Sequence, residues 1–285
     1  MAAWQRVHRD QQDILGEGLL WSARTRALYW VDILAPALHR LSLVDARITH
    51  WPMPEPVGWI VERAAGGFIA GLQSGFAILH LDPLRITPLG DPEPHLPNNR
   101  MNDGKIDPDG SIWCGTMDMA EQADSGALYR FDPDLRWTCM DRGFRIPNGP
   151  AFSPCGAWLY LADSARRVIY RYARQSHGAL RARMEFIRFQ PEDGYPDGMT
   201  TDAQGGLWVA HWGGGRISRF SPEGTRLLSI ELPAKQISNL CFAGEKLDRL
   251  FVSSAAMGLP ASLYDGAVFE IAQKYKGVPS SLFAG

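Results

Sequence analysis

Cysteine is scarce in this sequence, and the cysteines that are present show no pairing pattern. The four thiols, at Cys114, Cys139, Cys155 and Cys241, include no C-x-x-C pair and lack the dense spacing of small secreted domains held by disulfides. We therefore expect reduced cysteines. Long apolar runs are absent as well: residues 1–18 contain no apolar core of signal-peptide length, and no later stretch approaches the ~20 apolar residues that span a bilayer. We expect a cytoplasmic protein that does not enter the membrane.

An excess of charge of one sign is also missing. The 285 residues include 29 Lys and Arg against 31 Asp and Glu, so the net charge of -2 offers no basic surface for a phosphate backbone, and we expect no nucleic-acid partner. Two enzyme motifs are absent too. Residues 213–215 are three glycines without the Lys-Ser/Thr of a phosphate-binding loop, which favours a turn, and no Ser lies in a G-x-S-x-G elbow.

What the sequence does contain is a pattern that occurs six times. Short segments rich in aromatic and branched residues recur as LYWVD at Leu28, GFIAG at Gly67, IWCGT at Ile112, LYLAD at Leu159, LWVAH at Leu207 and LFVSS at Leu250. Their starts are separated by 39, 45, 47, 48 and 43 residues. A second series follows them, as LHRL at Leu38, ILHL at Ile78, LYRF at Leu128, IYRY at Ile169, ISRF at Ile217 and VFEI at Val268.

These segments have the composition of β-strands. They are bounded by Gly, Asp, Pro and Ser, and no stretch holds a helical apolar stripe over three turns. Units of this length with several short strands each are typical of a β-propeller. We predict an all-β fold, a six-bladed β-propeller, that residues 1–285 form as a single domain.

The ends of the chain predict how the ring closes. The sixth unit has no clear outer strand after VFEIAQKYKG, whereas a spare apolar segment, WQRVHR at residues 4–9, precedes the first unit. We predict that this N-terminal strand completes the last blade, because such pairing removes two open sheet edges.

A third set of motifs precedes the first series of strands. It consists of GEG at 16–18, VGW at 57–59, NDG at 102–104, NGP at 148–150, PDG at 196–198 and SNL at 238–240. Equivalent positions of the innermost strands meet at one mouth of a propeller channel, which would bring together Glu17, Asn102 or Asp103, Asn148, Asp197 and Asn239. The alternative is that each motif is a simple turn between blades.

The chemistry of these side chains indicates a metal site. Buried carboxylates are costly unless they are paired or bind a metal, and the motifs themselves contain no lysine. Carboxylate and carboxamide oxygens favour Ca²⁺, Mg²⁺ or Mn²⁺ over thiophilic metals. We therefore predict one divalent metal ion on the axis.

Four segments carry a family resemblance. LGEG, NNRMNDGKIDPDGSIWCGTM, IPNGPAFSPCG and YPDGMTTDAQGGLWVA are similar, in order and spacing, to the hallmarks of the gluconolactonase, regucalcin and luciferin-regenerating enzyme family (senescence marker protein-like). The likeness covers nearly the whole chain, and within the family the sequence most resembles bacterial sugar lactonases. The resemblance implies a six-bladed propeller with one axial divalent metal that hydrolyses sugar lactones.

The resemblance also implies roles for individual residues. Glu17 of LGEG, Asn148 of PNGP and Asp197 of PDG would be the metal ligands. Arg100 and Asn102 of NNRMNDGK would contact the substrate, with Asp103 in support. A further acidic substrate contact lies after GTM in some members, and Glu121 in DMAEQADSG is the candidate here.

Hydrolysis of a lactone requires water to attack an ester carbonyl, and a divalent cation stabilises the negative charge that develops there. Asp197 can be both metal ligand and general base, but metal contact weakens a carboxylate as a base. Activation of the water by the metal, with Asp197 only orienting it, is therefore an open alternative. We expect Trp59 and Trp212 to form an apolar wall at the mouth and His211 to face the channel or to be packed.

Two other functions remain open from sequence. The same metal site can hydrolyse phosphotriesters or fluorophosphates, in which the metal polarises P=O. A propeller can also bind calcium or a protein partner without turnover, although a protein-binding platform needs no acidic cage on its axis. The particular sugar lactone, the metal and the oligomeric state are not determined by the sequence.

Overall fold

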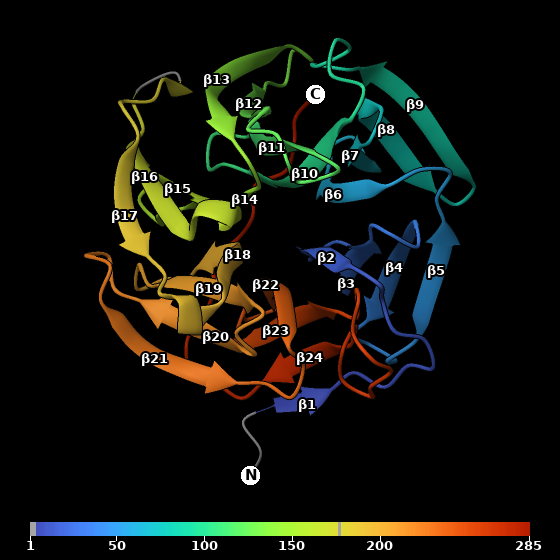
Figure 1. Cartoon of the computed structure of the whole chain (residues 1–285). Helices are drawn as coiled ribbons and strands as arrows, with labels where there is room; N and C mark the ends of the chain where they lie inside the picture. The colour runs from blue at the N-terminus through green and yellow to red at the C-terminus, as the bar shows by residue number, and fades with distance from the viewer. Residues whose placement is uncertain (1–3, 176–177) are drawn as a thin grey trace.

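The computed structural model of the chain describes residues 4–175 and 178–285. In these residues, 24 strands form six antiparallel sheets of four strands each. The sheets stand around a central axis like the blades of a propeller (Figure 1). The prediction of a six-bladed β-propeller is therefore confirmed.

Each of the first three blades is a meander of consecutive strands. They are, in chain order, blade 1 with β2 (Gly16–Ser22), β3 (Ala27–Asp32), β4 (Ala37–Ser42) and β5 (Ile48–Pro52); blade 2 with β6 (Val57–Glu62), β7 (Phe68–Leu72), β8 (Gly75–Leu81) and β9 (Leu84–Gly90); and blade 3 with β10 (Asn99–Ile106), β11 (Ile112–Asp118), β12 (Gly126–Phe131) and β13 (Trp137–Phe144).

The other three blades follow the same plan, with two short 3-10 helices at their connections. They are blade 4 with β14 (Pro147–Phe152), β15 (Trp158–Asp163), η1 (Ser164–Arg166), β16 (Val168–Ala173) and β17 (Met184–Arg188); blade 5 with η3 (Pro191–Asp193), β18 (Tyr195–Thr201), β19 (Leu207–Trp212), β20 (Arg216–Phe220) and β21 (Arg226–Glu231); and blade 6 with β22 (Gln236–Ala243), β23 (Arg249–Ala255), β24 (Val268–Ile271) and β1 (Trp4–Arg6).

The three series of sequence motifs correspond to the three inner strands of each blade. The aromatic first series forms the second strands; β3 and β11, for example, are buried along their whole length. Such strands read as continuous apolar segments because both of their faces pack against neighbouring blades. The apolar side chains therefore form a core between the blades, and the axis is left to the polar residues of the innermost strands.

The N-terminal strand closes the ring, as predicted. β1 pairs with β24 in antiparallel register, with Trp4 opposite Ile271 and Arg6 opposite Phe269. The backbone N–H of Val7 extends this ladder by donating to the carbonyl of Val268 at 2.8 Å. Because the first strand of the chain completes the last blade, blade 6 has no missing strand.

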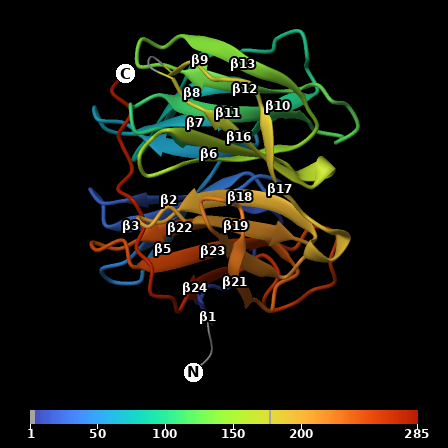
Figure 2. The ribbon, with the colours of Figure 1, turned by 90° about the vertical axis from the view of Figure 1, so that its left-hand side faces the viewer.

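The innermost strands begin at one face of the ring, which we call the upper face. The C-terminal segment spans the opposite face, which we call the lower face. Figure 2 shows this segment in red, along one face of the molecule. The Lys276 carbonyl accepts from Ala203 of blade 5, Ser281 donates to the Pro108 carbonyl of blade 3, and Phe283 pairs with Arg63 next to blade 2. Phe283 is fully buried, so the segment fastens three blades to one another.

No helix in the described part of the chain is long and apolar enough to cross a membrane. The four cysteines are all free, which agrees with the expectation of reduced thiols.

Candidate functional site

The third set of motifs lies inside the innermost strands and not in turns. In each of β2, β6, β10, β14, β18 and β22, the pairing with the second strand shifts register at the motif: between Glu17 and Leu20, Val57 and Trp59, Met101 and Gly104, Asn148 and Ala151, Pro196 and Met199, and Ile237 and Leu240. A bulge of this kind redirects a side chain out of the regular alternation. The alternative that these motifs are simple turns between blades is therefore wrong.

Glycine permits the bulges at two places where no other residue fits well. Gly18 has a φ of +59°, in the left-handed region that favours glycine. A Cβ atom on Gly198 would lie 2.6 Å from the Nδ2 atom of Asn239. The Gly that follows Glu17 and the Gly that follows Asp197 therefore allow those carboxylates to approach residues of neighbouring blades.

Seven polar side chains come together at the upper ends of the innermost strands, and we call them the axial cluster: Glu17, Arg100, Asn102, Asp103, Asn148, Asp197 and Asn239. All seven are buried. Asn239 connects two carboxylates, because its Nδ2 donates to Glu17 Oε2 at 2.8 Å and to Asp103 Oδ2 at 3.2 Å. This amide links blade 6 to blade 1 on one side and to blade 3 across the axis.

A second chain of hydrogen bonds runs through blades 3 to 5. Arg100 Nη1 donates to Asn102 Oδ1 at 2.8 Å, and Asn102 Nδ2 donates to Asn148 Oδ1 at 2.8 Å. Asn148 Nδ2 then donates to Ser164 Oγ at 2.9 Å, and Ser164 donates to the Pro196 carbonyl at 2.5 Å. The residue before Asp197 is therefore connected to Arg100, and the Asn148 oxygen keeps a second lone pair for another partner.

The carboxylates of the cluster are held in an unfavourable environment for negative charge. Burial and the negative charge of Asp103 raise the pKa of Glu17 to about 8, and burial raises the pKa of Asp103 to about 6. Burial and the charge of Glu17 raise the pKa of Asp197 well above its ordinary value. In the described chain no Arg, Lys or His lies within ion-pair distance of these three carboxylates.

The donor atoms of the cluster fit a hard divalent cation. No three His, Cys, Asp or Glu side chains form a metal-holding group in the described residues. The predicted set of Glu17, Asn148 and Asp197 consists instead of two carboxylates and one carboxamide, all oxygen donors of the kind that Ca²⁺, Mg²⁺ and Mn²⁺ prefer. A dication among buried carboxylates with raised pKa values would also remove the cost of their negative charge.

Glu121 lies at the edge of the site, on the loop between β11 and β12. The negative charge of Glu121 favours the protonated form of both Arg100 and Asp197. Asp118 shapes this loop by accepting hydrogen bonds from the backbone N–H groups of Ala120, Gln122 and Ala123 at 3.1–3.2 Å. Glu121 itself is exposed with a φ of +58°. The loop therefore holds an acidic side chain whose charge reaches the axial cluster.

The structure corrects the expectation for Trp59 and confirms one of the two placements expected for His211. Trp59 is fully buried in the core and packs edge-on against Phe76, so it forms no wall at the mouth. It sits there because Gly71 and Gly104 leave room for its ring. His211 is packed: its Nδ1 lies 2.9 Å from the Asp193 carbonyl and its ring lies 4.5 Å from that of Phe189.

The sequence reasoning missed two residues of the site. Lys105 follows the NDG motif directly, and its positive charge lowers the pKa of Asp103. Its place next to the motif was the signal that could have found it. Ser164, which binds Asn148, lies in the short helix η1 after β15, and no feature of the sequence indicated it.

The ring and the buried, oxygen-rich cluster at its axis define a class of protein, the six-bladed propellers with a polar site at one mouth of the channel. The chain belongs to the SMP-30/gluconolactonase/LRE-like family, whose characteristic region matches residues 15–256. The resemblance drawn from the sequence motifs is therefore confirmed.

Two relatives and one solved structure show how close the similarity is. The chain is 36% identical over 281 residues to a 6-deoxy-6-sulfogluconolactonase of Pseudomonas putida, which covers 96% of this chain and 97% of the relative. It is 34% identical over 285 residues to an L-arabinolactonase of Azospirillum brasilense, with 97% and 94% covered. The structure of a calcium-binding regucalcin from Agrobacterium tumefaciens matches with a TM-score of 0.95 at 27% identity, covering 100% of this chain and 98% of the other.

Proposed function

We propose that this protein is an enzyme, a sugar lactonase, which opens aldonolactones to aldonic acids at the axial cluster and holds one divalent metal ion there. The observation that carries the proposal is the burial of Glu17, Asp103 and Asp197 together on the axis, without an ion-pair partner in the described chain. The names of two relatives, a sulfogluconolactonase and an L-arabinolactonase, support the choice of a lactone as substrate.

Glu17, Asn148 and Asp197 would hold the metal. When bound there, a divalent cation supplies positive charge that stabilises the negative charge developing on the lactone carbonyl oxygen. The hydrogen bonds that Asn239 donates to Glu17 and Ser164 accepts from Asn148 keep these two side chains in fixed orientations. Fixed ligands need little reorganisation when the cation binds.

Arg100 and Asn102 would bind the sugar. Burial lowers the pKa of Arg100 to about 10, so its guanidinium stays protonated at neutral pH and can donate to hydroxyl groups or to the ring oxygen. One of its nitrogens already donates to Asn102, which orients both side chains. Glu121 would accept a hydrogen bond from a hydroxyl group at the outer edge of the same sugar.

Asp197 would act as the general base. It accepts a proton from the water as the water oxygen attacks the carbonyl carbon, and it returns a proton to the ring oxygen as the ester C–O bond breaks. Burial raises the pKa of Asp197, and a carboxylate with a raised pKa is a stronger base than an ordinary one. Metal contact lowers the pKa of Asp197 in turn, so an orienting role for this side chain is the alternative to test.

The proposal is tested by elemental analysis of the purified protein together with a pH-stat assay. The assay follows acid release from gluconolactone, xylonolactone, arabinolactone and galactonolactone, with aryl phosphotriesters as the competing substrates. We expect bound divalent metal, acid release that stops after chelation, and faster turnover of a lactone than of any phosphotriester. Faster phosphotriester turnover would reassign the activity, and bound calcium with no turnover of any substrate would make the protein a calcium-binding propeller.

A further inference from the structure

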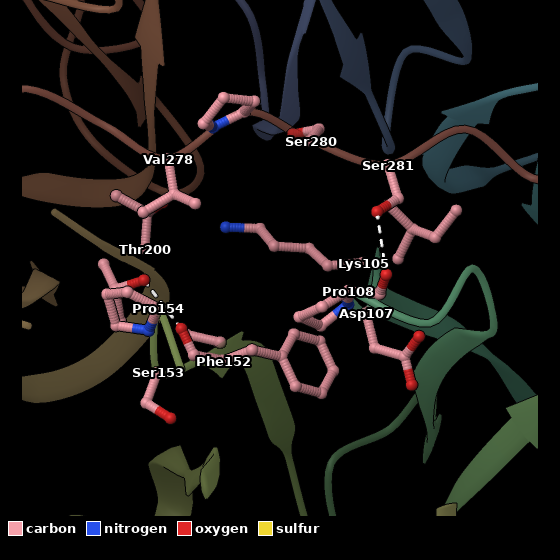
Figure 3. A pocket seen from close by; sticks show the side chains of 14 residues that line it. Lys105, Asp107, Pro108, Phe152, Ser153, Pro154, Thr200, Val278, Ser280 and Ser281 are labelled. Atoms are coloured by element: carbon pink, nitrogen blue, oxygen red, sulfur yellow. Dashed lines mark hydrogen bonds between the residues drawn. The ribbon is translucent and has the colours of Figure 1, made fainter. Parts of the chain in front are cut away.

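Lys105 lies in the channel below the axial cluster. Its side chain extends into the middle of a cavity of about 160 Å³ at the lower face, between the ends of β10, β14 and β18 and the C-terminal segment (Figure 3). Val278, Ser280 and Ser281 of that segment lie along one side of the cavity. The lysine therefore stands between the axial cluster above and the C-terminal segment below.

The ammonium group of Lys105 makes a contact across the channel. It donates a hydrogen bond to the carbonyl oxygen of Met199, so it links β10 of blade 3 to β18 of blade 5, which are not adjacent blades. Met199 ends the bulge that contains Asp197. The inner edge of an innermost strand has no neighbouring strand, so its carbonyl groups need side-chain partners. Lys105 is this partner for the carbonyl of Met199, which lies two residues after Asp197.

The positive charge of Lys105 is not neutralised by an ion pair in the described residues, so it can act on the axial cluster. In the described chain no carboxylate lies within ion-pair distance of Lys105. After burial, the charge of Lys105 is the largest influence on the pKa of Asp103, which it lowers. Lys105 therefore offsets part of the negative charge that Asp103 brings to the axial cluster.

We propose that Lys105 is a positioning residue of the axial site: its ammonium ties the bulge that carries Asp197 to β10, and its charge stabilises the carboxylate cluster when no metal is bound. Only the expected effect of Lys105 on turnover rests on the proposed function. Two consequences follow for metal binding. Without Lys105 the metal-free protein has more uncompensated negative charge and is less stable, and a divalent cation meets less repulsion at the same site.

The test compares Lys105→Met, which keeps the length of the side chain, with Lys105→Arg, which keeps the charge. Lys246→Met, in an exposed turn, controls for the loss of one positive charge elsewhere. Melting temperature is measured in chelator and then with Ca²⁺ or Mn²⁺, and calorimetric titration with the same metal gives its Kd. In chelator we expect Lys105→Met to melt roughly 3–8 °C below the wild type, with Lys246→Met unchanged and Lys105→Arg in between.

On adding metal, the rise in melting temperature should be larger for Lys105→Met than for the wild type, and its Kd should be lower by at least about threefold. On the lactone that the wild type turns over fastest, kcat should fall at least about tenfold with KM nearly unchanged. An unchanged melting temperature in chelator, or a Kd that is unchanged or higher, would overturn the proposal. If the wild type turns over no lactone, the proposed function fails, while the stability and Kd measurements still decide the role of Lys105.

Discussion

At the scale of single residues, the site depends on side chains that satisfy one another across blades. Asn239 of blade 6 binds carboxylates of blades 1 and 3, and Asn102 of blade 3 binds Asn148 of blade 4. Buried polar groups of this kind are costly to leave without a partner, so a substitution at one position affects its neighbours. Variants that keep shape and remove a single charge or donor are therefore the most informative.

Asp197→Asn separates the proposed base from a simple structural residue. The change keeps the size of the side chain and removes one buried negative charge. We expect metal affinity to fall, and kcat at saturating metal to fall by at least ~10², because general-base catalysis is typically worth that much. Steady-state lactone hydrolysis at several metal concentrations measures both, with the exposed Asp134→Asn as the matched control. Full recovery of kcat at saturating metal would leave Asp197 only a ligand and an orienting group.

Arg100→Ala tests substrate binding. Loss of a charge-assisted hydrogen bond to the sugar, worth about 1.5–3 kcal/mol, should raise KM by roughly tenfold or more. The melting temperature should also fall, because Arg100 is buried and Asn102 Oδ1 loses its donor. Arg85→Ala, on the exposed strand β9, is the control. Unchanged KM and kcat combined with lower stability would mean that Arg100 only holds Asn102 in place.

At the scale of elements, the bulged innermost strand is the unit that makes the site. The sequence motifs predicted the six strands, their order and the convergence of Glu17, Asn148 and Asp197 on one mouth, because repeat phase and strand composition are properties of consecutive residues. Apart from the closing strand, which the missing strand of the sixth unit indicated, contacts between distant segments have no such signature. The placement of Trp59 in the core depends on Gly71 and Gly104 facing it, and the contact of Lys105 with Met199 crosses the channel.

Removal of residues 1–12 tests the closing strand as an element. The deletion takes away β1, its ladder to β24 and the 2.6 Å ion pair between Arg9 and Asp13. It leaves β24 with an open edge, so we expect the melting temperature to fall by at least about 5 °C. Removal of residues 1–3 alone keeps β1 and is the control. A full-length melting temperature after the longer deletion would contradict the role of β1 in closure.

At the scale of the whole molecule, buried histidine makes stability depend on pH. Burial lowers the pKa of His211 to about 4. In the unfolded chain His211 takes up a proton as the pH falls through about 6.5, whereas in the folded chain it stays neutral down to about pH 4. The contribution of neutral His211 to stability is therefore complete above pH 6.5 and is lost as the pH falls towards 4. Between pH 7 and pH 4 we expect the wild type to lose roughly 2–3 kcal/mol more unfolding free energy than His211→Phe.

Urea unfolding at pH 7, 5.5 and 4 measures this difference. His39, whose pKa burial lowers to about 3, acts in the same direction in both proteins and cancels in the comparison. The exposed His95→Phe should follow the wild type at every pH. Parallel pH dependence of His211→Phe and the wild type would show that His211 does not set the acid stability.

The pairing of β1 with β24 also has a consequence for the timing of folding. The side chain of Gln5 donates a hydrogen bond to the side chain of Glu270, which lies 265 residues later in the chain. Ribosomes add about 5–20 residues per second, so the first of these two segments waits roughly 13–50 s before its partner is made. Contacts of such long range are formed late and slowly. During synthesis the first five blades can stack in order, but the ring stays an open arc until the sixth blade is made, and the synthesis of β24 becomes the step that commits the chain to its native shape.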